Sequence, residues 1–180
     1  MEASARNNIP LIVMDRPNPN AHYVDGPVLD LENQSFVGMH EVPIVYGLTI
    51  GEYATMINNE GWLNNNMKSN LTIIGLKNYN RKVTYDLPIL PSPNLPNRKS
   101  INLYPSLCLF EGTNVSAGRG TEMQFQIYGS PYLNKEKNNF RFTPKKNSGS
   151  KYPKHENLLC FGKNLSENKK LDKLDLSFLL

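Results

Sequence analysis

The sequence holds few residues of the kinds that bind metal ions, with two cysteines and three histidines scattered over 180 positions. No Cys-x-x-Cys or His-x-x-x-His spacing occurs, and such spacings are typical of structural zinc sites. Cys108 stands between two leucines in "SLCLF", which favours a buried, unreactive thiol over a nucleophile or a metal ligand. We therefore expect no metal site and no cofactor.

Long apolar stretches are also lacking. No run approaches the roughly 20 residues that cross a bilayer. The first residues do not show the basic start, apolar middle and small-residue end of a signal peptide. The sequence therefore predicts a soluble chain without a membrane span.

Positive charge is concentrated in one segment of the chain. Residues 135–173 hold eleven Lys and Arg against four Asp and Glu, whereas the whole chain carries a net charge of +4. The segment is also rich in Asn, Ser, Gly and Pro, so we interpret it mainly as a solvated loop region. It has neither a recognition-helix pattern nor regularly spaced aromatic residues, so nucleic acid is not an expected partner. An anionic cell-wall glycan fits the same charge.

The first half of the chain has the pattern of an α/β fold. Two short apolar runs, 9–14 and 70–76, are typical of strands buried on both faces of a parallel sheet. Between them, 43–47 predicts another strand, and Thr49 with Glu52 forms a capping box that begins a helix. The order strand, loop, strand, helix, strand indicates an α/β layer.

A rigid polar loop, "DRPNPN", follows the first of these strands. Loops at the carboxyl ends of parallel strands commonly carry ligand contacts, and the two prolines restrict the backbone there. Asp15, Arg16 and Asn18 are therefore candidate site residues. The alternative is that Asp15 and Arg16 pair with each other and satisfy loop amides.

The second half of the chain begins with a proline-rich segment, 87–97, which we interpret as an extended strap between two lobes, 1–87 and 88–180. A short helix with Pro105 in its first turn is expected to end at Glu111. Alternating residues further on predict strands in "QFQIYG" and "FRFTP". The last apolar segment has no obvious finish, and few residues precede the first strand. We therefore expect both lobes to be truncated.

The glycine-rich stretch 114–131 is a further polar concentration in the second half. Arg119 lies there between Gly118 and Gly120, which allow close approach of backbone to a ligand. The stretch is neither a Walker loop nor the start of a dinucleotide-binding fingerprint. By itself it is a weak signal.

Four longer motifs carry a family resemblance: "DRPNPN" with "DGP", "SFVGMHEVPIVYGLTIGEYATMINNEGWL", "LPSPNLPN" and "LYPSLCLFEGTNVSAGRGTEMQFQIYG". In this order they resemble the NamZ-like family of bacterial exo-β-N-acetylmuramidases, from about residue 9 to the end. The resemblance implies part of a Rossmann-like parallel-sheet lobe followed by a smaller α+β auxiliary lobe, with a pocket between them. It implies removal of terminal N-acetylmuramic acid from peptidoglycan fragments. Since family members are usually exported or lipid-anchored, it also implies a periplasmic or extracellular location.

Two departures from the family pattern bear on activity. The family's Pro-Glu-His-Gly type motif, to which its catalytic glutamate is ascribed, has no match in this chain. Arg81 stands where many relatives place a histidine. The resemblance is therefore compatible with an enzyme, with a non-catalytic muropeptide-binding module, or with an inert piece of a split gene.

Glycoside hydrolysis ordinarily uses two carboxyl groups, and we expect Glu111 and Asp15 in these roles because each ends an apolar element. A guanidinium binds a carboxylate through two parallel hydrogen bonds, so Arg16 and Arg119 are matched to the lactyl group of N-acetylmuramic acid. The expected substrate-binding residues are Arg16, Asn18, Asn94, Arg119 and Glu122. For each, the alternative is a loop residue that satisfies its own backbone.

Overall fold

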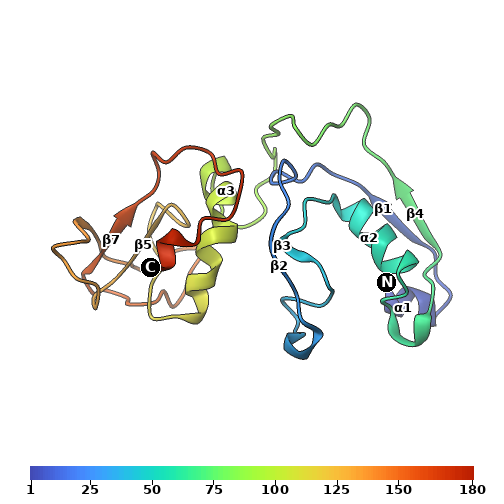
Figure 1. Ribbon diagram of the computed structural model, residues 1–180, viewed down its shortest axis with the longest axis horizontal. Coiled ribbons are helices and arrows are strands. Elements are labelled where there is room, and N and C mark those ends of the chain that lie inside the picture. Colours follow the sequence, from blue (N-terminus) through green and yellow to red (C-terminus); the bar gives the residue numbers. More distant parts are fainter. The chain divides into compact units, whose positions relative to one another are not determined.

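The computed structural model describes residues 1–180 as two compact units, Met1–Tyr85 and Asp86–Leu180 (Figure 1). Each unit contains helices and strands, so the prediction of a mixed fold with a parallel sheet is confirmed. The lobe boundary predicted between residues 87 and 88 stays a prediction. No helix of the chain is long and apolar enough to span a membrane.

The first unit is built on two parallel strands, β1 (Leu11–Met14) and β4 (Leu71–Ile74), with Leu11 opposite Leu71. Helix α2 (Ile50–Asn59) packs on this pair, as Figure 1 shows. The predicted burial on both faces is wrong. Side chains alternate between the faces of a strand, and those directed away from α2 are largely exposed. The clearest examples are Ile12 (63%) and Met14 (81%).

A separate hairpin joins β2 (Asp25–Val28) and β3 (Pro43–Val45) in antiparallel pairing (Figure 1). The strand expected within 43–47 exists, but its placement in the α/β layer is wrong because its partner is β2. The sequence analysis missed β2, whose Gly26 and Pro27 are residue types depleted in strands. The other short elements of this unit are α1 (Glu2–Arg6), η1 (Leu31–Asn33) and η2 (Asn64–Asn66).

The second unit begins with α3 (Arg98–Leu107), which starts well before the predicted helix. Asn97 is the reason: its side chain accepts from the Ser100 N–H at 2.9 Å and so caps the helix. Pro105 therefore lies in the last turn and not in the first. A 3₁₀ turn, η3 (Cys108–Gly112), continues the helix past Glu111.

The second unit also holds an antiparallel sheet in the order β5 (Ile127–Ser130), β7 (Cys160–Asn164), β6 (Phe140–Phe142). The segment 135–173 is mainly loop and turn, as predicted, but it also holds β7, the middle strand of this sheet, which the sequence analysis missed. This strand approaches β5 so closely that a Cβ at Gly162 would lie 1.8 Å from the Tyr128 carbonyl oxygen. Only glycine fits there.

One hydrophobic cluster joins the helix, the glycine-rich stretch and the C-terminal segment of this unit. Its buried members are Leu103, Leu107, Phe110, Ala117, Phe125, Tyr128 and Leu165. Phe178 of the last short element, η4 (Leu176–Leu179), packs against the cluster. The core thus fixes both ends of the stretch that carries Glu111 and Arg119.

Candidate functional site

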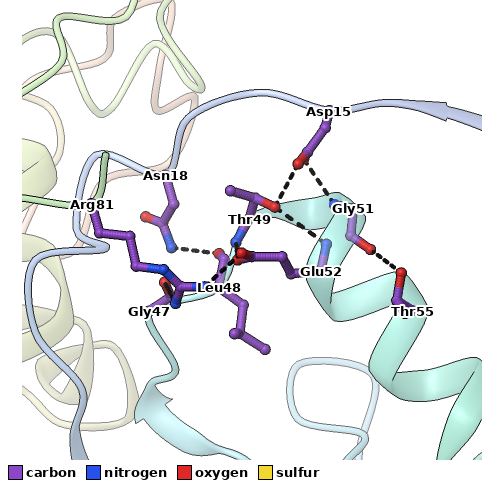
Figure 2. A network of polar contacts seen from close by, with 9 residues as sticks. All are labelled: Asp15, Asn18, Gly47, Leu48, Thr49, Gly51, Glu52, Thr55 and Arg81. Carbon is purple, nitrogen blue, oxygen red and sulfur yellow. Dashed lines mark hydrogen bonds and ion pairs between the residues drawn. The ribbon is translucent and has the colours of Figure 1, made fainter. Parts of the chain in front are cut away.

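In the first unit, Asp15 lies directly after β1 and points at the start of α2 (Figure 2). Its Oδ2 accepts a 2.6 Å hydrogen bond from the Thr49 hydroxyl, and its Oδ1 accepts from the Gly51 N–H at 2.9 Å. Oδ1 also accepts from the Arg16 N–H at 2.9 Å. The carboxylate therefore sits where the partial positive charge of a helix N-terminus stabilises an anion.

Gly51 makes this approach possible. A Cβ at this position would lie 2.8 Å from Asp15 Cγ and 2.8 Å from Ile73 Cγ2. Any larger residue would push the helix away from both the carboxylate and the β4 strand. The close packing of the start of α2 against the end of β1 therefore requires glycine at position 51.

The rest of the helix start is held by a wider polar network, also drawn in Figure 2. Thr49 and Glu52 form the predicted capping box, with the Thr49 N–H donating to Glu52 Oε2 at 2.8 Å. Arg81 Nη2 pairs with Glu52 Oε1 at 2.5 Å, and its Nη1 donates to the Gly47 carbonyl at 3.1 Å. Arg81 therefore stabilises the cap.

Asn18 also belongs to this junction. Its Nδ2 donates to the Leu48 carbonyl at 2.8 Å, and its Oδ1 accepts from the Asn20 N–H at 2.9 Å. Arg16, in contrast, exposes its side chain, and its contact with Asp15 comes from its backbone N–H and not from its guanidinium. Asp15 and Asn18 therefore accept hydrogen bonds from nearby backbone amides, which is the structural alternative given in the sequence analysis. The Asp15–Arg16 ion pair of that alternative does not form. Of the residues predicted here, Arg16 is the one whose side chain is available to a ligand.

In the second unit, Glu111 and Arg119 form an ion pair, with Nη1 to Oε2 at 3.0 Å. Both side chains are about two-fifths exposed, at 43% and 39%. The Arg119 Nε–H and Nη2–H₂ groups make no hydrogen bond within the chain. Because a guanidinium presents five donors, one edge of Arg119 remains free for a second carboxylate.

Tyr104 lies beside this ion pair. Burial raises the pKa of its phenol, Cys108 and Glu111 raise the pKa further, and Arg119 lowers it. The phenol therefore stays protonated at neutral pH and can donate a hydrogen bond. Sequence reasoning missed this residue because it assigned "LYPSL" to a helix start with no site role.

The two remaining candidates differ in environment. Asn94 Nδ2 donates to the Gly149 carbonyl at 2.7 Å, while its Oδ1 is buried without a partner. Glu122 is exposed on the glycine-rich stretch. The structure thus brings Glu111 together with Arg119, and Asp15 together with Asn18 near α2, and it places Asn94 and Glu122 elsewhere in the second unit. No group of three or more His, Cys, Asp or Glu side chains is arranged to hold a metal ion.

Comparisons with known proteins agree over both units. The family model described as "Exo-beta-N-acetylmuramidase NamZ, N-terminal" matches residues 1–99, and the one described as "Exo-beta-N-acetylmuramidase NamZ, C-terminal" matches 102–180. The peptidoglycan beta-N-acetylmuramidase NamZ of Bacillus subtilis (strain 168) is 43% identical over 138 residues, which are 74% of this chain and 32% of that protein.

Two crystal structures of DUF1343 family proteins from Bacteroides fragilis NCTC 9343 share the fold. One is 48% identical with a TM-score of 0.93 over 99% of this chain and 51% of its own. The other is 28% identical with a TM-score of 0.80 over 99% of this chain and 50% of its own. The chain therefore spans about half the length of these structures and about a third of the B. subtilis relative.

Proposed function

Since the chain belongs to the NamZ family of exo-β-N-acetylmuramidases, we propose that it takes part in removing terminal N-acetylmuramic acid from peptidoglycan fragments. The observation that carries the proposal is the half-free Arg119 guanidinium on a motif shared with the family. N-acetylmuramic acid differs from N-acetylglucosamine by a lactyl ether that ends in a carboxylate. The free edge of Arg119 is suited to that carboxylate.

In this proposal Glu111 acts on the glycosidic bond, and Tyr104 supplies a neutral hydrogen-bond donor beside it. Glu111 pairs with the Arg119 guanidinium, and we assign it the role of the carboxylate that activates water or attacks carbon. Asp15 is less suited to proton donation, because both its oxygens accept hydrogen bonds at the start of α2. The side chain that pairs with Glu111 is the Arg119 guanidinium, and no second carboxyl group contacts Glu111 to give a proton to the leaving oxygen.

The lack of a proton donor beside Glu111 favours a second candidate, a non-catalytic module that binds muropeptides. Such a module keeps the carboxylate-binding arginine and needs no acid. The decisive experiment incubates the purified chain, beside a longer relative, with an N-acetylmuramic acid–N-acetylglucosamine disaccharide and measures free N-acetylmuramic acid. Release supports the enzyme. Binding without release supports the module, and the absence of both contradicts the two.

The role of Arg119 has its own test. Titration calorimetry compares N-acetylmuramic acid with N-acetylglucosamine, which lacks the carboxylate. Arg119→Gln should weaken binding of the acid about tenfold or more, since hydrogen bonds to charged groups contribute about 1.5–3 kcal/mol. Arg141→Gln, an exposed arginine in the same unit, is the matched control. If the unmodified chain binds the two sugars with equal affinity, Arg119 does not bind the lactyl carboxylate.

We also propose a periplasmic or extracellular location, because peptidoglycan lies outside the cytoplasmic membrane. Fractionation of producing cells, with immunodetection of the native protein, tests this. Recovery in the cytoplasmic fraction alone would contradict it.

A further inference from the structure

The Lys154 side chain ends inside a ring of backbone carbonyl oxygens. Its Nζ donates to the carbonyls of Phe110 at 3.0 Å, Val115 at 3.1 Å and Glu111 at 3.4 Å, and also to that of Thr113. An ammonium has three hydrogens, so four oxygens around it must share them. Four backbone oxygens thus surround the amine of Lys154.

The ring oxygens belong to residues 110–115, which comprise the end of η3, with Glu111, and the turn that follows it. Exposed carbonyls in such a turn repel one another unless a cation or N–H groups lie between them. Four of them converge on one point, and Lys154 is the group that occupies it. Burial lowers the pKa of the Lys154 ammonium, and the nearby Glu111 carboxylate raises it.

The neighbouring residue, His155, contacts the same segment. His155 Nε2 lies 2.6 Å from the Asn114 carbonyl oxygen, which can only accept, so this nitrogen carries the proton. His155 has φ of +59°, a left-handed conformation that costs free energy for a residue with a side chain. This backbone turn lets consecutive side chains, 154 and 155, both bind the segment 110–115.

We propose that Lys154 is a built-in cation that organises the 110–115 carbonyls and thereby positions Glu111 against Arg119. It is a positioning residue and does not touch the sugar. The carbonyl ring is therefore a cation site that accepts a small alkylammonium when the lysine is shortened. Only the link from Glu111 and Arg119 to substrate rests on the proposed function.

Lys154→Ala removes the atoms from Cγ to Nζ, which correspond to n-propylammonium. The variant should melt about 5 °C or more below the wild type, and about 50 mM n-propylammonium should recover a large part of that loss. Propan-1-ol has the same size without the charge and should recover little. Lys151→Ala, an exposed lysine three residues earlier, should melt like the wild type and show no response.

Nuclear magnetic resonance supplies a readout for positioning. In Lys154→Met, which keeps the stem and removes the donors, the Arg119 Nε–H and Glu111 side-chain signals should shift, whereas Lys151→Met should leave them in place. An N-acetylmuramic acid titration then reports separately on the proposed function. Shifted signals with unchanged sugar affinity would keep Lys154 as an organiser of the turn and contradict its link to binding.

A measurement on the wild type avoids any folding defect of the variants. Amine hydrogens of exposed lysines exchange rapidly with water, so their signals are lost. The Lys154 Nζ–H₃ group donates to several carbonyl oxygens, so its hydrogens should exchange slowly and give an observable ¹⁵N-coupled signal. Absence of a protected lysine signal, or failure of n-propylammonium to exceed propan-1-ol in the rescue, would overturn the proposal.

Discussion

The Thr49 hydroxyl donates a 2.6 Å hydrogen bond to Asp15 Oδ2, although the two residues lie 34 positions apart. Thr49 is the N-cap of α2 and Asp15 is the residue that follows β1. One carboxylate thereby ties the end of a strand to the start of a helix. This contact makes a structural role the first explanation for Asp15, and it can be tested apart from catalysis.

Asp15→Asn should destabilise the first unit. The change keeps the size of the side chain but removes the charge that the Thr49 hydroxyl, the Gly51 N–H and the helix N-terminus stabilise. The expected loss in the free energy of unfolding is about 1–2 kcal/mol, measured by urea denaturation. Asp172→Asn, at an exposed position, is the control and should be neutral. If both variants unfold alike, the capping role of Asp15 is disproved.

Gly51→Ala should also destabilise this unit, although alanine is normally better than glycine inside a helix by about 1 kcal/mol. The added Cβ would lie 2.8 Å from atoms of Asp15 and Ile73. We expect a net loss of about 1–3 kcal/mol from overpacking. Gly75→Ala meets no atom within 4 Å and should be tolerated in the same thermal melt. If Gly51→Ala stabilises the chain, the start of α2 is not tightly packed against Asp15 and Ile73.

Glu111→Gln separates binding from catalysis. Removing the carboxylate charge weakens the ion pair with Arg119 and leaves the guanidinium more available to a ligand. We expect the affinity for N-acetylmuramic acid to rise severalfold in calorimetry. We expect hydrolysis by a longer relative with the matching change to fall by at least about a hundredfold, since the water-activating carboxylate is lost. Unchanged hydrolysis would leave Glu111 as a partner of Arg119 only.

Cys160 should make stability depend on alkaline pH. Burial raises the pKa of its thiol to about 11, above its ordinary value of 9.0. Between these values the unfolded chain loses the thiol proton while the folded chain keeps it. The free energy of unfolding should therefore fall as pH rises from 9.0 to about 11.

The Cys160→Ala variant isolates this effect from other groups that titrate in the same range. Its free energy of unfolding should fall less steeply over that window than the wild-type value, by parallel urea denaturation at each pH. Equal slopes would mean that the thiol titrates at its ordinary pKa in the folded chain.

Several features could be predicted from local sequence because their causes are local. The capping box of Thr49 and Glu52 begins α2 as expected, and the apolar runs at 9–14 and 70–76 form β1 and β4. The start of α3 was missed because Asn97 caps it through Ser100, a weaker pattern than the Thr-Glu box. Strand β7 was missed because its central residue is a glycine, which has little strand preference and is required there by the approach of β5.

The sequence by itself determined the family, through long ordered motifs, and the residue types able to bind a carboxylate or act on a glycosidic bond. Only the tertiary structure decided how these residues are used. Asp15 is occupied by α2, Glu111 is paired with Arg119, and Lys154 is enclosed by carbonyls from 39 to 44 positions away. The physical reason is that a hydrogen bond or an ion pair depends on distance and direction between atoms. Local pattern does not determine either one for residues that are distant in the chain.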